Sequence, residues 1–234
     1  MTECRSDSVP PPYPGTSKEC DQDHGDESTS QTKPTSTRKI PSNYATIVRD
    51  KGPIKAEFNI DPTLDIDDSL LPPLMEGETE SKRNHLNVIA LNGEVDIEVR
   101  LEPSVLQSLE VRMDVQSLRG DLIVKLYTPS PSKFLKCRLN VTAKNGSIYL
   151  VLPRDFVGLV DVVAKGQMIV SDLLSSNFNI QSEFGSARKC TIGSLTRSNI
   201  EKNKVVAGAD KGRVYLQYND EQFEKRRIGW FEGL

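Results

Sequence analysis

Residues 137–153, which read CRLNVTAKNGSIYLVLP, show the pattern that decides the fold. Aliphatic residues alternate with polar ones up to a turn at Asn145-Gly146, and the alternation resumes after the turn until Pro153. Period-two apolar spacing on both sides of an Asn-Gly pair is typical of two strands joined by a turn. The stretch therefore predicts a strand, a turn and a second strand.

The same unit recurs along the chain. It is centred on six glycines: Gly93, Gly120, Gly146, Gly166, Gly185 and Gly212. Aliphatic residues stand two, four and often six positions after most of them, and seven and five positions before. The Gly166 unit is displaced by one position, and the Gly185 unit loses the pattern at Lys189. Self-similarity over some tens of residues indicates stacked repeats, and the lack of helical spacing predicts almost no helix.

Two all-β architectures fit these units. In a β-solenoid-like stack of repeats, each unit is one coil and the glycines form its corners. In an antiparallel β-sandwich, each unit is a hairpin. The short units and matched aliphatic columns favour the solenoid. The residues expected to face the core are Val95, Ile97, Leu122, Val124, Ile148, Leu150, Val170 and Leu216.

Composition divides the chain into three parts. Residues 1–52 form a Pro/Ser/Thr-rich segment with too few large aliphatic residues to offset the entropy of ordering, so a disordered tail is expected. Residues 53–221 form the repeat domain, with 54–75 expected to cap one end. Residues 222–234 contain three basic residues followed by Trp230 and Phe231, which predicts a cap on the last unit or a weak contact with an anionic membrane.

Charge and cysteine content exclude several classes of protein. The net charge of −3 argues against a nucleic-acid binder held by phosphate contacts. The four cysteines form no C-x-x-C pair, and the chain shows no secretion signal or membrane span, which favours a reducing cytoplasm. No metal site or cofactor is predicted.

The N-terminal segment contains one specific peptide motif, Pro10-Pro11-Pro12-Tyr13. Pro-Pro-x-Tyr is the ligand pattern of WW domains, because the prolines form a polyproline II helix and the tyrosine ring fills a groove. The motif predicts a WW-domain protein as a partner.

Catalytic residues are scarce, and the sequence predicts a non-enzymatic binding or scaffold protein. The two histidines, His24 and His85, lie in the tail and in a charged linker, so no histidine serves a catalytic triad. Asp155, Asp161 and Asp172 are the nearest candidates for the carboxylate pair of a carbohydrate-active enzyme of the β-helix type. That enzyme and a peripheral membrane-surface protein are the alternatives.

Strand alternation predicts which residues face outward and are candidates for a binding surface. The residues three positions after each glycine should face away from the core. They are Asp96, Ile123, Tyr149, Ile169, Arg188 and Tyr215. Four of the six are apolar or aromatic, which is unusual for a solvated face. Either another layer such as residues 54–75 covers them, or Ile123, Tyr149, Ile169 and Tyr215 form a surface for a partner.

These units resemble a fungal domain family of unknown function that is similar to bacterial adhesin-head-like β-repeat domains. The resemblance covers residues 53–220 and rests on IDPTL at 60–64, NVIALNGEV at 87–95, AKNGSI at 143–148 and DKGRVYL at 210–216. It implies a β-repeat fold, often with a Pro-Pro-x-Tyr tail and a tryptophan near the C-terminus. It implies no activity.

Overall fold

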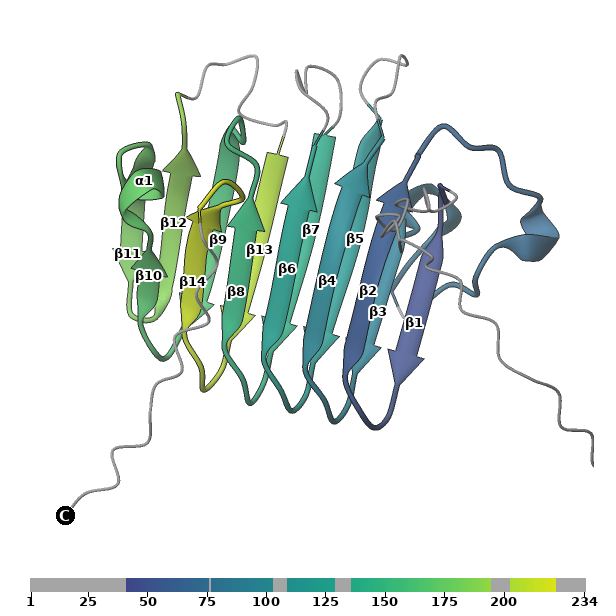
Figure 1. Ribbon diagram of the computed structural model, residues 1–234, viewed down its shortest axis with the longest axis horizontal. Coiled ribbons are helices and arrows are strands. Elements are labelled where there is room, and N and C mark those ends of the chain that lie inside the picture. The colour runs from purple at the N-terminus through teal and green to yellow at the C-terminus, as the bar shows by residue number, and fades with distance from the viewer. Residues whose placement is uncertain (1–40, 76, 103–108, 129–135, 195–202, 222–234) are drawn as a thin grey trace, which may run out of the picture. The chain divides into compact units, whose positions relative to one another are not determined.

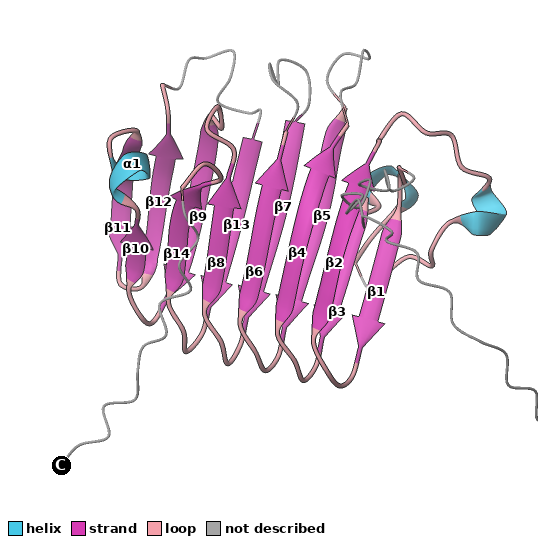
Figure 2. Ribbon diagram, viewed as in Figure 1, coloured by secondary structure: helices cyan, strands magenta, loops and turns pink. Residues whose placement is uncertain are grey.

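The structure of the protein is a computed structural model that describes residues 41–75, 77–102, 109–128, 136–194 and 203–221. Within these residues the strands form two sheets (Figures 1 and 2). The eight-stranded sheet has the order β1 (Ala45–Arg49), β3 (Leu86–Ala90), β5 (Glu110–Ser117), β7 (Lys136–Ala143), β13 (Asn203–Ala209), β9 (Gly158–Ala164), β12 (Ala187–Ile192) and β11 (Phe178–Phe184). The six-stranded sheet has the order β10 (Met168–Val170), β14 (Val214–Tyr218), β8 (Ile148–Leu152), β6 (Leu122–Tyr127), β4 (Val95–Leu101) and β2 (Ile54–Ile60).

The chain passes back and forth between the two sheets. A strand of the eight-stranded sheet leads through a short glycine turn into a strand of the six-stranded sheet, and we call each such pair a coil. The coils are β1–β2, β3–β4, β5–β6, β7–β8, β9–β10 and β13–β14. Neighbouring coils pair in parallel, so their glycine turns lie along one edge (Figure 1).

Parallel pairing excludes the antiparallel meander of hairpins over most of both sheets. Within the described residues, the antiparallel pairs are β9–β12 and the hairpin β12–β11. The prediction of almost no helix holds for the same residues. They contain one α-helix, α1 (Asp172–Ser175), and the 3-10 turns η1 (Asp68–Leu70) and η2 (Glu80–Lys82).

The core lies between the sheets and consists of aliphatic rows that run across the coils. In one row of the six-stranded sheet, Ile97 pairs with Val124, Val124 with Leu150 on β8, and Leu150 with Leu216 on β14. All four side chains are buried, because alternate residues of a strand point to the same face. The expected inward residues therefore face the core, with Val170 at the margin packed against it.

The glycine turns contact one another directly. A Cβ atom added at Gly93, Gly120, Gly146, Gly212 or Gly166 would overlap the carbonyl oxygen of the glycine in the neighbouring coil. These residues, together with Gly52 at the end, form what we call the glycine column. Gly185 is outside it: it forms the β11–β12 hairpin turn at φ 58°, and an added Cβ there would meet no atom within 4 Å. Lys189, where the aliphatic alternation after Gly185 breaks down, lies on β12, the second strand of this hairpin.

The coils do not stack in chain order. The last pair, β13–β14, lies between coil β7–β8 and coil β9–β10. Strand β13 pairs in parallel with β7 on one side and β9 on the other. Its inward residues Val205, Ala207 and Ala209 are fully buried, as part of the core. The polar strand β11 instead occupies an edge, where one row of backbone groups is unpaired.

The structure corrects the N-terminal boundary and the expectation that residues 54–75 cover the outer face of the sheet. Strand β1 lies within the stretch 1–52 that composition assigns to the tail, because a five-residue strand adds little apolar content. Strand β2 pairs with β4 as an edge strand, so it extends the sheet and does not cover its outer face.

The glycine column predicts a position-specific cost of a single methyl group. Gly146→Ala should destabilise the protein by about 3 kcal/mol, at the upper end of penalties for overpacking. The added Cβ would overlap the backbone of Gly120. Urea unfolding followed by circular dichroism measures the difference in free energy.

Gly208→Ala in β13 is the matched control, because its added Cβ would meet Thr142 at 3.9 Å, an ordinary contact. It should change the stability by no more than about 1 kcal/mol. Equal effects of the two substitutions would contradict the role of the column.

Candidate functional site

The outer face of the six-stranded sheet brings together the four residues expected to form a surface. Strand register aligns Ile123 with Tyr149, Tyr149 with Tyr215, and Tyr215 with Ile169. We call these four residues the outer row. Lys55 and Asp96 continue it on β2 and β4. Arg188 is not part of it, because it lies on β12 in the other sheet.

The centre of the outer row is buried. The exposed fraction is 3% for Ile123 and 8% for Tyr149, and it rises to 36% for Ile169 at the edge. The rings of Tyr149 and Tyr215 stack with centroids 4.5 Å apart and planes 4° from parallel. Burial, with smaller effects of Asp121 and Tyr215, raises the pKa of Tyr149 to about 12. The row is therefore an apolar strip of two stacked tyrosines flanked by two isoleucines.

A second row runs beside it and is mixed in character. Val151 on β8 is 4% exposed, and Gln217 on β14 and Lys125 on β6 are its neighbours. The ammonium of Lys125 lies 3.2 Å from Glu98 and 3.4 Å from Asp96. Partial burial alone would lower the pKa of Lys125, but hydrogen bonds and attraction from the two carboxylates raise it above its ordinary value.

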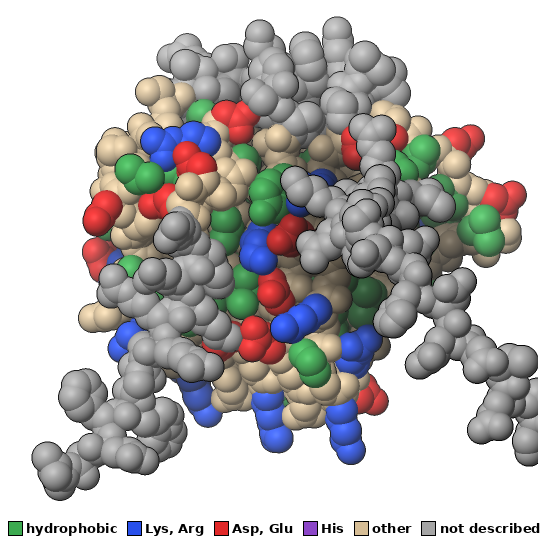
Figure 3. All heavy atoms as spheres, in the orientation of Figure 1, with side chains coloured by type: hydrophobic (Ala, Val, Ile, Leu, Met, Phe, Trp, Pro, Cys, Tyr) green, Lys and Arg blue, Asp and Glu red, His purple; other side chains and the backbone are tan. Residues whose placement is uncertain are grey.

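An acidic hollow lies at the end of these rows, over β2, β4 and β6. Its volume is about 220 Å³, and it is lined by Lys55, Ala56, Glu57, Asp96, Glu98 and Lys125. With three carboxylates and two ammonium groups, the hollow is net acidic. Figure 3 shows acidic and basic side chains beside apolar ones on this face. Together, the outer row and the acidic hollow suit a peptide with aromatic and basic residues.

The three aspartates considered for catalysis lie on separate elements. Asp155 is in the loop after β8, where it accepts a long hydrogen bond of 3.4 Å from the Thr128 hydroxyl. Asp161 on β9 forms an ion pair with Lys204 at 2.8 Å, and Asp172 begins α1. The structure thus does not join them in one site.

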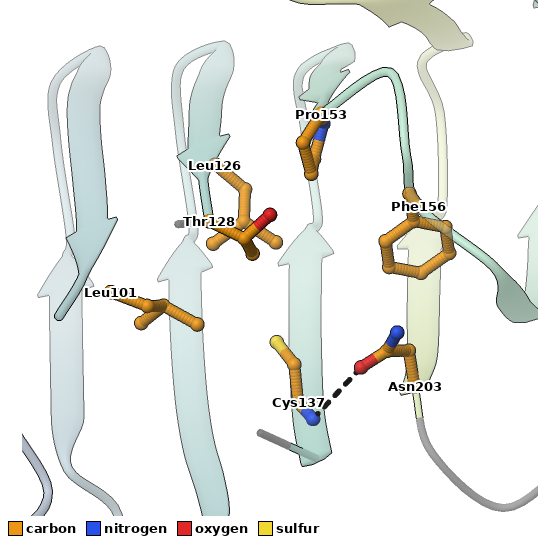
Figure 4. A pocket seen from close by; sticks show the side chains of 7 residues that line it. All are labelled: Leu101, Leu126, Thr128, Cys137, Pro153, Phe156 and Asn203. Atoms are coloured by element: carbon orange, nitrogen blue, oxygen red, sulfur yellow. Dashed lines mark hydrogen bonds between the residues drawn. The ribbon is translucent and has the colours of Figure 1, made fainter. Parts of the chain in front are cut away.

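The interior holds a small cavity near the ends of the strands (Figure 4). Its volume of about 10 Å³ is room for roughly one water molecule, so it cannot hold a substrate. Burial, and to a lesser degree Glu110, raises the pKa of the lining thiol of Cys137 to about 12. The Cys137 N–H donates to the Asn203 side-chain oxygen at 3.1 Å. This thiol is structural, since the reactive form is the thiolate.

Other sequence-based predictions fall outside the described residues. These are Pro10, Pro11, Pro12 and Tyr13, His24, and the segment 222–234. Among the residues that the structure does describe, no cluster of histidine, cysteine and carboxylate side chains is arranged to hold a metal ion. No described helix is long and apolar enough to cross a membrane.

His85 belongs to a structured cluster that the sequence reading missed. Its ring stacks on Tyr44 with centroids 5.2 Å apart, and the Arg83 guanidinium lies 5.8 Å from the centre of the Tyr44 ring. The Arg112 N–H donates to His85 Nδ1 at 3.2 Å, so this nitrogen carries no proton. The sequence does show that His85 directly precedes an aliphatic stretch, which is strand β3. The register of β3 with β5 brings His85 next to Arg112.

Comparison with known families gives one match. A family model described as a domain of unknown function, DUF7330, matches residues 43–221, which span the strands from β1 to β14. No curated protein and no solved structure matches the chain. The expected resemblance is confirmed as far as a domain family of unknown function. Fungal origin and similarity to adhesin-head-like domains stay predictions.

His85 predicts that stability decreases on acidification. Burial and the positive charge of Arg112, opposed by Glu110, lower the pKa of His85 from 6.5 to about 4. Between these values the unfolded chain binds a proton that the folded protein does not, so stability falls as the pH falls through this window. At 1.36 kcal/mol per unit the full loss is about 3 kcal/mol.

The matched variant is His85→Gln, which cannot take up this proton. Urea unfolding at pH 7 and at pH 4 should show the stability advantage of the wild type over the variant shrinking by about 3 kcal/mol. An advantage that stays constant with pH would show that His85 does not titrate in this way.

Proposed function

The chain belongs to the DUF7330 family of domains of unknown function, and we propose that it is a non-enzymatic binding or scaffold protein that binds an extended segment of a protein partner. The observation that supports this proposal is the outer row on the six-stranded sheet. Tyrosine is among the residues that contribute most to binding energy at protein interfaces, and Tyr149 and Tyr215 lie at the centre of this row. The partner segment carries aromatic residues for the outer row and basic residues for the acidic hollow.

A rigid support favours this role. The described coils pair in register, and we extend this to the finer proposal that the domain is a β-solenoid-like stack with one displaced coil. Ile123, Tyr149 and Tyr215 stand on strands with a hydrogen-bonded neighbour on each side, and Ile169 stands on the adjacent edge strand β10. The face is therefore preorganised. Preorganisation lowers the entropic cost of binding.

The two alternatives have weaker support. For a carbohydrate-active enzyme, the candidate Asp161 is already engaged with Lys204, and Asp155 and Asp172 lie on other elements. For a peripheral membrane protein, the three cations of the segment 222–234 contribute only about 3 kcal/mol near an anionic surface. The cytoplasm is the compartment we propose, because Cys137 and Cys190 are unpaired thiols buried in the core.

The second proposed binding activity is recruitment of a WW-domain protein through Pro10-Pro11-Pro12-Tyr13. The supporting observation is the motif, which lies about 30 residues before β1. A flexible linker of that length has an r.m.s. span of about 30 Å, which is sufficient to separate the motif from the domain. Tyr13 is the aromatic anchor, and the prolines position it.

Selection of peptides on the full chain tests the proposed face. Random peptides displayed on phage should yield sequences rich in aromatic and basic residues, with dissociation constants of about 1–100 μM, since a short segment must be ordered on binding. Tyr215→Asp should weaken their binding at least about tenfold, which is 1.4 kcal/mol.

Val163→Asp is the control, because Val163 is 47% exposed and lies on the eight-stranded sheet, whereas the outer row is on the six-stranded sheet. It should bind the selected peptides as the wild type does. Failure to enrich any peptide, or equal binding by all three proteins, would refute the proposed face.

Titration of the full chain against a panel of WW domains tests the N-terminal motif. At least one domain should bind the wild type, and Tyr13→Ala should weaken this binding about tenfold or more because it removes the aromatic anchor. Pro34→Ala, outside the motif, is the control and should bind normally. Equal binding by Tyr13→Ala and wild type would exclude this mode of recruitment.

A further inference from the structure

Two side chains on the outer face of the six-stranded sheet are almost fully buried. Ile123 and Val151 point away from the core, yet their exposed fractions are 3% and 4%. The opposite sheet supplies the comparison. Val163 also points outward from a strand with neighbours on both sides, and its exposed fraction is 47%. The partners of Val163 in register are small, Gly208 and Ala187, whereas Ile123 and Val151 lie between larger side chains on the neighbouring strands. These neighbours shield part of the outer row, and a chain segment lying over it would shield the rest.

The described elements do not supply this cover. The helix α1 packs on β14 and β11, but its buried residue Leu174 belongs to the core between the sheets. Residues 54–75, which the sequence predicts as a covering layer, contribute the edge strand β2 to the same sheet.

A polar group on the same face calls for the same segment. The Nε2 atom of Gln217 is buried and has no hydrogen-bond partner among the described residues. Gln217 lies in register with Val151 at the centre of the face. A buried donor without an acceptor is costly, and the carbonyl groups of a passing chain are suitable acceptors.

The C-terminal segment 222–234 starts where it can reach this face. It continues from β14, the strand that carries Tyr215. The Glu221 carboxylate accepts from the Tyr218 N–H at 2.6 Å and from the Ser171 hydroxyl at 2.7 Å, which fixes the point of departure. Residues 225–227 stand four to six positions after Glu221 and can extend about 13–20 Å from it, whereas three strand spacings from β14 to β4 cover about 14 Å. The chain after residue 227 can then return to the outer row.

The composition of this segment complements the face. It contains a basic run at residues 225–227 and five large apolar residues: Phe223, Ile228, Trp230, Phe231 and Leu234. The apolar residues match the outer row, and the basic run matches the acidic hollow. The other terminal segment, residues 1–40, has almost no large aliphatic residues to offer.

We propose that residues 222–234 bind in cis across the outer face of the six-stranded sheet, with Trp230 and Phe231 on the outer row and the basic run beside the acidic hollow. This inference rests on the proposed function, because it assigns an internal occupant to the same face. The segment covers the face, and a partner with the same chemistry must displace it. It differs from a cap on the last coil, which would leave Ile123 uncovered.

Trp230 is the one tryptophan of the chain, so intrinsic fluorescence reports on this segment directly. Acrylamide quenching of the full chain should be about tenfold weaker than that of a free peptide spanning 221–234, as expected for a segment bound about ten times as often as it is free. Ile123→Asp should raise quenching to the level of the peptide. The matched variant Val163→Asp should behave as the wild type.

A second variant lies in the segment itself and cannot unfold the domain core. The double substitution Arg226→Glu and Arg227→Glu places like charges beside Asp96 and Glu98, and quenching should increase as it does for Ile123→Asp. Quenching of the wild type that equals that of the peptide would overturn the proposal. So would low quenching that neither the Ile123 variant nor the charge reversal changes, because the segment would then bind elsewhere.

The peptide selection keeps the two proposals apart. If Trp230 is protected by the outer row and the charge-reversed chain still selects no peptide, the cis contact stands and the proposed partner binding fails. If peptides bind at Tyr215 while Trp230 is freely quenched in the wild type, the partner surface stands and the cis contact fails.

Discussion

Contact between glycine and the carbonyl oxygen of the next coil is the constraint on which the structure depends. Strands in a sheet lie about 4.8 Å apart, and the turns that join the two sheets must keep the same spacing. At the glycine column this brings each turn so close to its neighbour that no Cβ fits. The amide groups of Asn92 and Asn145 strengthen the stack by donating to the carbonyl groups of Asp50 and Leu118 in the preceding coil, at 3.1 Å and 3.0 Å. Since the turns are fixed in register, the strands that follow them are too. The buried rows and the outer row are both consequences of that register.

Much of this register is readable from the sequence, because alternation and distance from a glycine are local properties. They identified the inward residues of β4, β6 and β8 and the outward positions of Ile123, Tyr149, Ile169 and Tyr215. They could not identify which coils are neighbours. Gly166 precedes Gly212 in the chain but follows it in the stack, and nothing in the spacing around either glycine records the exchange. Arg188 was assigned to the outer row for a related reason: a hairpin glycine and a column glycine look alike until their backbone neighbours are known.

The candidate site divides in the same way. The apolar character of the outer row follows from residue types at fixed offsets, whereas its burial depends on which strands flank it and on what lies above. The pairing of Lys125 with Glu98 and Asp96 joins β6 to β4, about 27 residues apart, and is set by the parallel register. The His85–Tyr44 stack is also non-local, because β1 must first pair with β3. Side-chain pairs of this kind become visible only when the order of the strands is known.

The position of coil β13–β14 in the stack imposes an order on folding during synthesis. Strands β13 and β14 come after all the other described strands in the chain, yet β13 lies between β7 and β9, and β14 lies between β8 and β10. Until they arrive, β7 and β9 have no common partner, and neither do β8 and β10. The first four coils can pair as they emerge, but the final closure joins segments that are about 66 positions apart in the chain, as in the pairing of Cys137 with Asn203. Long-range pairing of this kind slows folding and leaves strand edges open to wrong partners in the meantime. A nascent chain that stalls before residue 203 would therefore expose unpaired edges on β7, β9, β8 and β10 to the cell's folding machinery.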